Sequence, residues 1–169
     1  MQQLTHYNSK FKQQTFPIIV ICENVSNAPN IGSLFRICDA FGVEKLIFCG
    51  EHIPIPSRKM QKTSRATEKH VPFQLVPDIH PIIKELKESH ELIALEITQK
   101  SIAVQNLKIN INKPIALIIG DENFGVSEDI LAQVNTVTHI NMFGQNSSMN
   151  VVQATNIALY EITKQLQLN

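Results

Sequence analysis

The chain has 169 residues, 43% hydrophobic and 18% charged, which fits one soluble domain with a full core and excludes a disordered protein. Fifteen basic residues balance fifteen acidic ones, and a net charge of zero excludes no partner, because a nucleic-acid site needs only a local basic patch. The three cysteines lie in or beside apolar runs and six histidines are scattered, so we expect buried thiols, no disulfide and no metal. No signal-like or membrane-spanning apolar run is visible, which predicts a cytoplasmic protein.

Polar residues 1–16 are predicted to form a tail, and residues 17–169 a single domain. The apolar, β-branched run 17–23 predicts a strand buried on both faces. After the turn residues 24–30, a helix ending near Gly42 is expected, because apolar residues recur at helical spacing. These residues are Ile31, Leu34, Phe35, Cys38 and Phe41. Residues 46–49 are predicted to form the second strand.

The middle of the chain predicts a polar, basic loop over 50–70 and a third strand over 71–76. A helix capped by Asp78 is expected to run through Ser89, followed by a strand over 91–97.

The C-terminal part predicts an apolar strand over 114–119, a helix over 126–134 and a short strand over 138–142. The final helix, residues 150–167, is apolar almost all round, so we expect it to be buried on more than one side. Apolar strands alternating with helices indicate an α/β domain with a mainly parallel sheet and helices on both faces. In such sheets, ligands bind at the carboxyl ends of the strands.

Three junction segments carry residues that can do chemistry. In the first, residues 27–36, Gly32 and Arg36 share a helix face, and we expect Gly32 to leave space beside the guanidinium. In the second, residues 118–125, two glycines flank an acidic pair directly after a buried strand, where backbone can approach a ligand closely. The third, residues 140–154, is rich in small and amide side chains beyond what one helix cap requires. Taken alone, the first segment is better explained as a capped helix with a solvated arginine, and the second as a tight turn with solvated carboxylates.

Together, the three segments resemble the three motifs of the SpoU (TrmH) family of RNA ribose 2′-O-methyltransferases, in the SPOUT superfamily. The resemblance covers about residues 17–165. The residues that carry it are Asn30, Gly32 and Arg36; Gly120, Glu122 and Gly125; and Ile140, Met142, Gly144, Ser148, Asn150, Val151, Leu159, Tyr160 and Glu161. Asn141 departs from the family's proline and Met149 from its leucine, and neither change removes a reacting group.

The resemblance implies a parallel sheet whose C-terminal part is threaded into a trefoil knot. It also implies a bent S-adenosylmethionine held by the loops of that knot, which correspond here to Leu95, Gly120, Ile140 and Met149. Family members pair two knots in a homodimer, in which the first-motif arginine of one subunit completes the site of the other. An apolar last helix suits such an interface.

For catalysis, the resemblance assigns Arg36, with Asn30, Glu122, Ser148 and Asn150 around it. Family mechanisms make the arginine a general base, but a guanidinium stays protonated in proteins, so it can instead hold the neighbouring phosphate. Four cations of the 50–70 segment are candidate RNA contacts, namely Arg58, Lys59, Lys62 and Arg65. Relatives that modify ribosomal RNA often carry an extra N-terminal domain, for which the residues before Asn24 leave no room, and this favours transfer RNA.

Two alternatives stay open. One is a catalytically silent RNA-binding protein on the same fold, which the intact catalytic set disfavours. The other is a nucleotide-dependent enzyme of Rossmann type, which the absence of a G-x-G-x-x-G run after the first strand disfavours.

Overall fold

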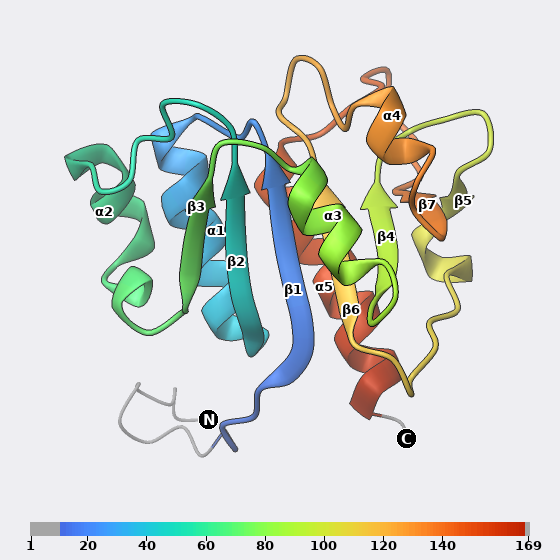
Figure 1. Cartoon of the computed structure of the whole chain (residues 1–169), viewed down its shortest axis with the longest axis horizontal. Coiled ribbons are helices and arrows are strands. Elements are labelled where there is room, and N and C mark those ends of the chain that lie inside the picture. The colour runs from blue at the N-terminus through green and yellow to red at the C-terminus, as the bar shows by residue number, and fades with distance from the viewer. Residues whose placement is uncertain (1–10, 168–169) are drawn as a thin grey trace.

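The computed structural model describes residues 11–167, in which seven parallel strands form one sheet with the order β3-β2-β1-β6-β4-β7-β5 (Figure 1). The strands are β1 (Phe16–Glu23), β2 (Val43–Cys49), β3 (Phe73–Val76), β4 (Glu91–Leu95), β5 (Ile102–Ala103), β6 (Ile115–Ile119) and β7 (Thr136–His139). The helices are α1 (Ala28–Ala40), α2 (Arg58–Ser64), α3 (His80–Leu86), α4 (Glu128–Leu131) and α5 (Val151–Gln167), with 3₁₀ turns at Thr67–Lys69 and Val104–Asn106. None of these described helices is long and apolar enough to cross a membrane.

The core is divided by the sheet into two apolar layers. One layer joins α1, α2 and α5 to one face, and the other joins α3 and α4 to the opposite face. Neighbouring β1 residues alternate between them: Val20 belongs to the first layer and Ile21 to the second. The predicted α/β fold with a parallel sheet and helices on both faces is therefore confirmed.

All three cysteines are free and buried, as predicted. Burial raises the pKa of the Cys22 and Cys38 thiols well above the usual range. Burial, followed by the nearby carboxylates of Glu23 and Asp78, raises the pKa of Cys49 to about 12. A thiol held protonated is a poor nucleophile, so these residues act as small core hydrophobes.

The first helix begins and ends as its sequence predicts. Asn27 is the N-cap and accepts a hydrogen bond from the backbone N–H of Asn30 at 3.2 Å. At the other end, Gly42 adopts a φ of +61°, which glycine tolerates and side-chain-bearing residues rarely adopt. The apolar stripe of α1 is buried against the sheet, which fixes the outward direction of its polar side chains.

The predicted loop over residues 50–70 is wrong in part, because residues 58–64 form helix α2. Ser57 caps this helix by accepting a hydrogen bond from the N–H of Met60 at 3.3 Å. The Met60 side chain is fully buried in the layer that contains α1. Met60 is the one buried apolar residue of α2, beside the buried Ser64, and a single apolar position gives no helical periodicity, so this helix depends on tertiary packing.

Gly32 has a different role from the one predicted for it. A Cβ atom placed on Gly32 would lie 2.1 Å from both the carbonyl oxygen of Met60 and the Oγ1 of Thr63. Gly32 therefore lets α2 approach the backbone of α1, and it does not open space beside Arg36. The consequence is that α2 holds its exposed cations at a fixed place beside α1.

Several predicted element boundaries shift. The third strand begins at Phe73, α3 ends at Leu86, β4 ends at Leu95 and β7 spans residues 136–139. The helix predicted over 126–134 is limited to Glu128–Leu131, because the backbone before it is tied to two carboxylates described below. Strand β5 was not predicted, since two residues carry no periodic signal. Of the predicted tail, residues 1–10 lie outside the described residues, and Phe16 belongs to β1.

The last helix begins at Val151, and the Asn150 carboxamide accepts from the N–H of Val152 at 2.9 Å. Within one chain, α5 buries a single face, so the prediction that it is buried on more than one side is wrong. Apolar side chains nevertheless remain outside: Ile157 is 37% exposed and Tyr160 is 62% exposed.

Candidate active site

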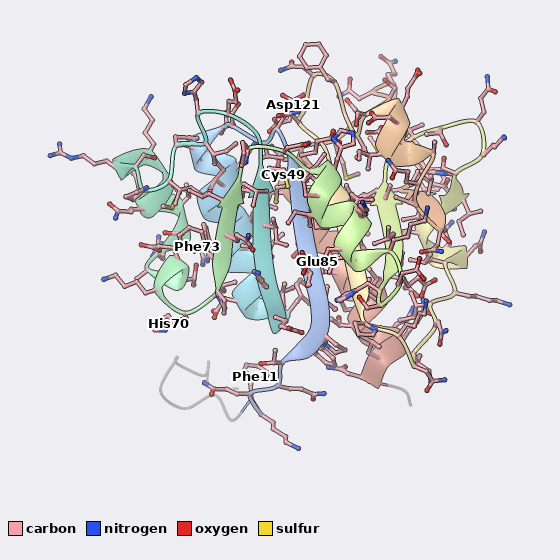
Figure 2. All side chains as sticks on the ribbon, viewed as in Figure 1. Phe11, Cys49, His70, Phe73, Glu85 and Asp121 are labelled. Atoms are coloured by element: carbon pink, nitrogen blue, oxygen red, sulfur yellow. The ribbon has the colours of Figure 1, made fainter. Side chains whose placement is uncertain are left out.

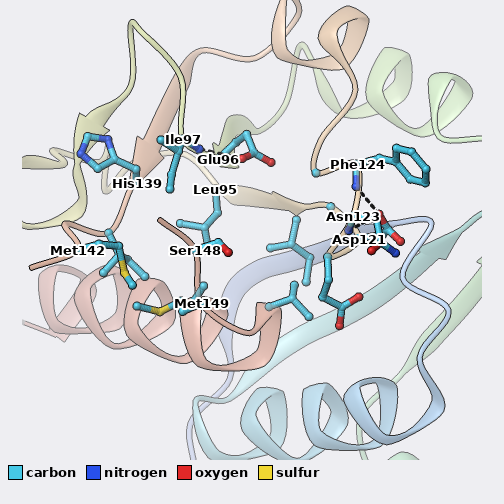
Figure 3. A pocket seen from close by; sticks show the side chains of 17 residues that line it. Leu95, Glu96, Ile97, Asp121, Asn123, Phe124, His139, Met142, Ser148 and Met149 are labelled. Atoms are coloured by element: carbon cyan, nitrogen blue, oxygen red, sulfur yellow. Dashed lines mark hydrogen bonds between the residues drawn. The ribbon is translucent and has the colours of Figure 1, made fainter. Parts of the chain in front are cut away.

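A cavity of about 290 Å³ lies at the carboxyl ends of β4, β6 and β7 (Figure 3). The strand register explains why this edge gathers functional residues: Ile119, the last residue of β6, pairs with Leu95 of β4 and Cys22 of β1. The four residues predicted to bind the cofactor all line this cavity, namely Leu95, Gly120, Ile140 and Met149. The position fits the rule that open α/β sheets bind ligands beyond the carboxyl ends of their strands.

Two buried or half-buried carboxylates hold the loop of residues 120–127 over this cavity. Glu23, at the end of β1, accepts hydrogen bonds from the Ser127 N–H at 3.0 Å and the Ser127 hydroxyl at 2.6 Å. Glu96, one residue beyond β4, accepts from the N–H of Val126 at 2.9 Å. Neither residue is recognisable as a site residue from the sequence, because their partners lie 104 and 30 residues away along the chain.

The two glycines of this loop permit close packing of backbone. A Cβ atom at Gly120 would lie 2.0 Å from the carbonyl carbon of Gly125 and 2.3 Å from the nitrogen of Val126. Gly125 has a φ of +66°, and a Cβ atom there would lie 2.2 Å from an oxygen of Glu96. The loop therefore folds back on its own start, in a turn that only glycine at these two positions allows.

The cavity is lined by three carboxylates and by no lysine or arginine among the described residues. Glu96, Asp121 and Glu122 are the acidic members, and His139 is the one titratable nitrogen base among the lining residues. Apolar side chains make up much of the remaining wall, including those of Leu95 and Met149 (Figure 3) and that of Ile140. Such a lining favours a ligand that combines apolar surface with positive charge, and it repels phosphate groups.

A chain of side-chain hydrogen bonds fastens the start of the third motif. The His139 Nδ1 lies 2.9 Å from the Ser101 hydroxyl, and its Nε2 lies 3.1 Å from the Asn141 Oδ1. Ser101 is in turn bonded to the backbone of Thr98. Asn141 thus gains a side-chain anchor that the family's proline does not have, and the anchor ties residues 139–141 to the loop after β4.

Asn30, Glu122 and Asn150, one from each predicted motif, meet at the rim of the cavity. The Asn30 Nδ2 donates a hydrogen bond to the Glu122 Oε1, and the Asn150 Nδ2 donates to the Asn30 Oδ1 at 3.2 Å. No described residue donates to the other carboxylate oxygen of Glu122. Ser148 lines the cavity itself and is exposed. These four predicted residues therefore present hydrogen-bonding groups around one opening.

Arg36 does not join this group within one chain. It lies six residues after Asn30 on α1, about 9 Å further along the helix axis and turned by about 240°. Its surroundings are instead a shallow groove between α1 and α2, which it lines with Ser33, Ile37, Ala40, Lys62, Thr63 and Arg65. Arg36 forms no hydrogen bond or ion pair with another described residue. Within one chain Arg36 thus lies apart from Asn30, Glu122, Ser148 and Asn150, and the prediction that these residues orient it stays a prediction about the site shared with a second subunit.

The basic side chains predicted to contact RNA are exposed and carried by α2. Arg58, Lys59 and Lys62 belong to the helix, and Arg65 is its C-cap. Lys62 and Arg65 share the groove with Arg36. The structure thus separates two surfaces: an acidic and apolar cavity at the sheet edge, and a cationic groove between α1 and α2.

The chain is similar to known proteins both in sequence and in structure. Residues 17–160 match the model of the SpoU rRNA Methylase family. A tRNA (guanosine(18)-2′-O)-methyltransferase of Thermus thermophilus is 30% identical over 148 residues, which cover 88% of this chain and 75% of that enzyme. The solved TrmH/SpoU tRNA-modifying enzyme of A. aeolicus aligns with a TM-score of 0.82 at 27% identity, over 92% of this chain and 78% of that one. The AdoMet complex of AviRb from Streptomyces viridochromogenes aligns at 0.81 with 22% identity, over 94% and 63% of the two chains.

Proposed function

Because this chain belongs to the SpoU rRNA Methylase family, we propose that it transfers a methyl group from S-adenosylmethionine to a ribose 2′-hydroxyl of RNA. The observation that carries the proposal is the meeting of Asn30, Glu122 and Asn150 at the rim of the cavity. Two relatives named above are a 2′-O-methyltransferase and a tRNA-modifying enzyme. Neither a silent RNA-binding protein nor a Rossmann-type enzyme gains support from them.

The cavity suits S-adenosylmethionine by its size and charge. Its volume of about 290 Å³ is close to the lower end of small-molecule sites, which span ~300–1,000 Å³. Leu95, Ile140 and Met149 offer apolar surface to the adenine ring and the methionine chain. The carboxylates of Glu96, Asp121 and Glu122 favour its sulfonium and ammonium charges. When bound, the cofactor supplies an electrophilic methyl group.

The residues at the rim are proposed to orient the ribose. The free carboxylate oxygen of Glu122 can accept a hydrogen bond from a ribose hydroxyl, and Asn30 holds Glu122 in place. Asn150, which is bonded to Asn30, adds an amide at the same rim, and Ser148 adds a hydroxyl in the lining of the cavity. Fixing the hydroxyl in line with the transferred methyl group is the main contribution expected from such groups.

Cofactor binding should occur without RNA and should depend on the charge of the ligand. We expect S-adenosylmethionine to bind with a micromolar dissociation constant, about −8 kcal/mol. ATP at the same concentration should show no binding, because three carboxylates face its phosphates. Isothermal titration calorimetry measures both. Binding of ATP but not of S-adenosylmethionine would support the Rossmann-type alternative and contradict the proposal.

The reaction itself can be tested with purified protein, methyl-labelled S-adenosylmethionine and bulk RNA from a strain that lacks this gene. A 2′-O-methyl group removes the nucleophile for alkaline cleavage, so label should remain in a dinucleotide after complete alkaline hydrolysis. Label recovered on a mononucleotide would place the methyl group on a base and reject the ribose assignment.

We further propose that the protein acts as a homodimer. Two observations support a second copy: Arg36 is remote from the Glu122 cluster of its own chain, and Ile157 and Tyr160 leave apolar surface on α5. The partner's Arg36 would complete each site.

Light scattering at micromolar concentration should therefore give twice the chain mass. The variant Ile157→Asp should shift the mass toward one chain by placing a charge on the apolar surface. A monomer in the wild-type protein would leave Arg36 without its proposed site.

The substrate and the chain path extend this proposal. Transfer RNA is favoured, because the two relatives with the highest identity reported above act on it by name. The trefoil knot is proposed from family membership. The path of the chain supports this proposal. Strand β7 lies next to β4 in the sheet, the segment after β7 lines the same cavity as the loop after β4, and the chain then continues into α5, which packs beside α1.

A further inference from the structure

Phe124 is an apolar side chain in a position that folding does not explain. Its side chain is 91% exposed, so it contributes almost nothing to the core. Phe124 lies at the rim of the cavity, among the residues that line it, and in Figure 3 its ring projects from the loop after β6 away from the other lining side chains. What singles out Phe124 is its place on a loop that borders the binding cavity, since loops at such sites commonly carry the residues that contact ligands.

The backbone that carries Phe124 is firmly held. The Asp121 carboxylate accepts hydrogen bonds from the N–H groups of Asn123 at 3.0 Å and Phe124 at 2.7 Å. The Gly125 N–H donates to the Asp121 carbonyl at 3.0 Å. Glu96 and Glu23 fasten the next two residues. The ring is therefore presented at a defined place, and little backbone ordering is needed when a partner binds.

The neighbours of Phe124 indicate what that partner is. Glu122, two residues earlier, belongs to the cluster proposed to hold the target ribose. The base of a nucleotide is attached to C1′, which is bonded to the C2′ that carries the reacting hydroxyl. A ribose held at Glu122 therefore brings its base, or the adjacent one, to the side of the opening where the ring projects. Unpaired bases in RNA are commonly held by stacking on aromatic side chains.

We propose that Phe124 is a stacking platform for an unpaired nucleobase at or next to the methylated nucleotide. This inference rests on the proposed function, because it takes the position of the ribose from it. A phenyl ring offers no hydrogen bonds, so the contact accepts any of the four bases and stabilises an extruded nucleotide without reading its identity. Discrimination between bases must then come from other groups.

The first test compares kinetics of variants at this position. Phe124→Ala should lower kcat/KM for bulk tRNA from a gene-deletion strain by about 5- to 150-fold, which corresponds to the ~1–3 kcal/mol of one stacked base. Phe124→Tyr should stay close to wild type, whereas Phe124→Leu, which keeps apolar volume but has no ring, should resemble alanine. Affinity for S-adenosylmethionine should stay within about twofold, because the ring is 91% exposed and projects outward from the rim of the cavity.

Phe11 provides a matched control. It is 89% exposed, and Figure 2 shows it at the end of the molecule opposite Asp121. Phe11→Ala should leave kcat/KM unchanged. If Phe124→Ala also leaves it unchanged while wild-type protein methylates ribose, the stacking proposal fails and the proposed function stands.

A binding measurement separates the two proposals further. The chain has no tryptophan, so Phe124→Trp introduces a single reporter. Its fluorescence should be quenched on titration with the same tRNA in the absence of cofactor, whereas that of Phe11→Trp should not. If the fluorescence is quenched but the protein forms no 2′-O-methyl product, the proposed reaction is rejected and the proposed base contact stands.

If Phe124→Ala instead halves the mass measured by light scattering, the ring belongs to a contact between two copies, and the stacking proposal is overturned.

Discussion

Replacing Arg36 with alanine is expected to lower the rate of methyl transfer by about 10² or more, the scale for losing one key electrostatic group. The guanidinium is proposed to hold the phosphate beside the target ribose and to stabilise the negative charge that develops on the 2′-oxygen. Affinity for S-adenosylmethionine should change little, because Arg36 lines the α1–α2 groove and not the cavity. Single-turnover assays and calorimetry on Arg36→Ala test both statements.

Two further variants give this prediction its controls. Arg36→Lys keeps the charge but loses the planar fork, so full activity in that variant would exclude bidentate phosphate holding. Arg58→Ala removes a cation outside the groove and should weaken RNA binding with a smaller effect on the rate of the bound complex. Loss of cofactor binding in Arg36→Ala would contradict the assignment of Arg36 to the RNA side.

Mixing variants tests whether Arg36 acts across subunits. A chain with Arg36→Ala retains its cavity, and a chain with Gly120→Ala retains Arg36. Random exchange of the two variants makes half of the dimers mixed. In a mixed dimer, the cavity of the Arg36→Ala chain receives Arg36 from the Gly120→Ala chain, which gives one complete site out of two. About a quarter of wild-type activity should therefore return. No recovery in confirmed mixed dimers would show that Arg36 acts within its own chain.

The second large effect is expected at Gly120. In Gly120→Ala, the new methyl group would lie 2.0 Å from the carbonyl carbon of Gly125, so the loop of residues 120–127 must move. Relieving such overpacking costs ~1–3 kcal/mol, which predicts a loss of about 5- to 150-fold in affinity for S-adenosylmethionine and a lower melting temperature. Calorimetry and thermal unfolding measure the two effects.

Gly144 is the matched control for this variant. It lies on the third-motif loop, and a Cβ atom there would meet nothing within 4 Å. Gly144→Ala should therefore leave both cofactor affinity and melting temperature unchanged. Equal effects of the two substitutions would mean that close packing at Gly120 does not shape the cavity.

Most of the fold could be predicted from local patterns, whereas long-range contacts could not. The run 17–23 is apolar at nearly every position because β1 is buried on both faces, and that pattern is visible in the sequence. Helix α2 has no such pattern, since its main anchor is Met60 packed beside α1 at Gly32. A glycine shows that something approaches its backbone, but it does not show which segment does.

The candidate site divides in the same way. The three motifs led to the residues that line the cavity and its rim, because those residues lie at the carboxyl ends of strands. Glu23 and Glu96 could not be predicted as anchors of the 120–127 loop. They reach the backbone of Val126 and Ser127 only because the register of β1, β6 and β4 brings the ends of these strands together. Arg36 lies about 120° from Asn30 around the α1 axis, so one chain does not show the site in the second subunit that the resemblance assigns to it.

The central claim is tested most directly by mass spectrometry of nucleosides from the RNA of a strain that lacks this gene. One 2′-O-methylated nucleoside should disappear from purified tRNA, return with the wild-type gene, and fail to return with Arg36→Ala expressed at the same level. Loss of a base-methylated nucleoside, or an unchanged set of 2′-O-methyl nucleosides in both tRNA and ribosomal RNA, would contradict the account.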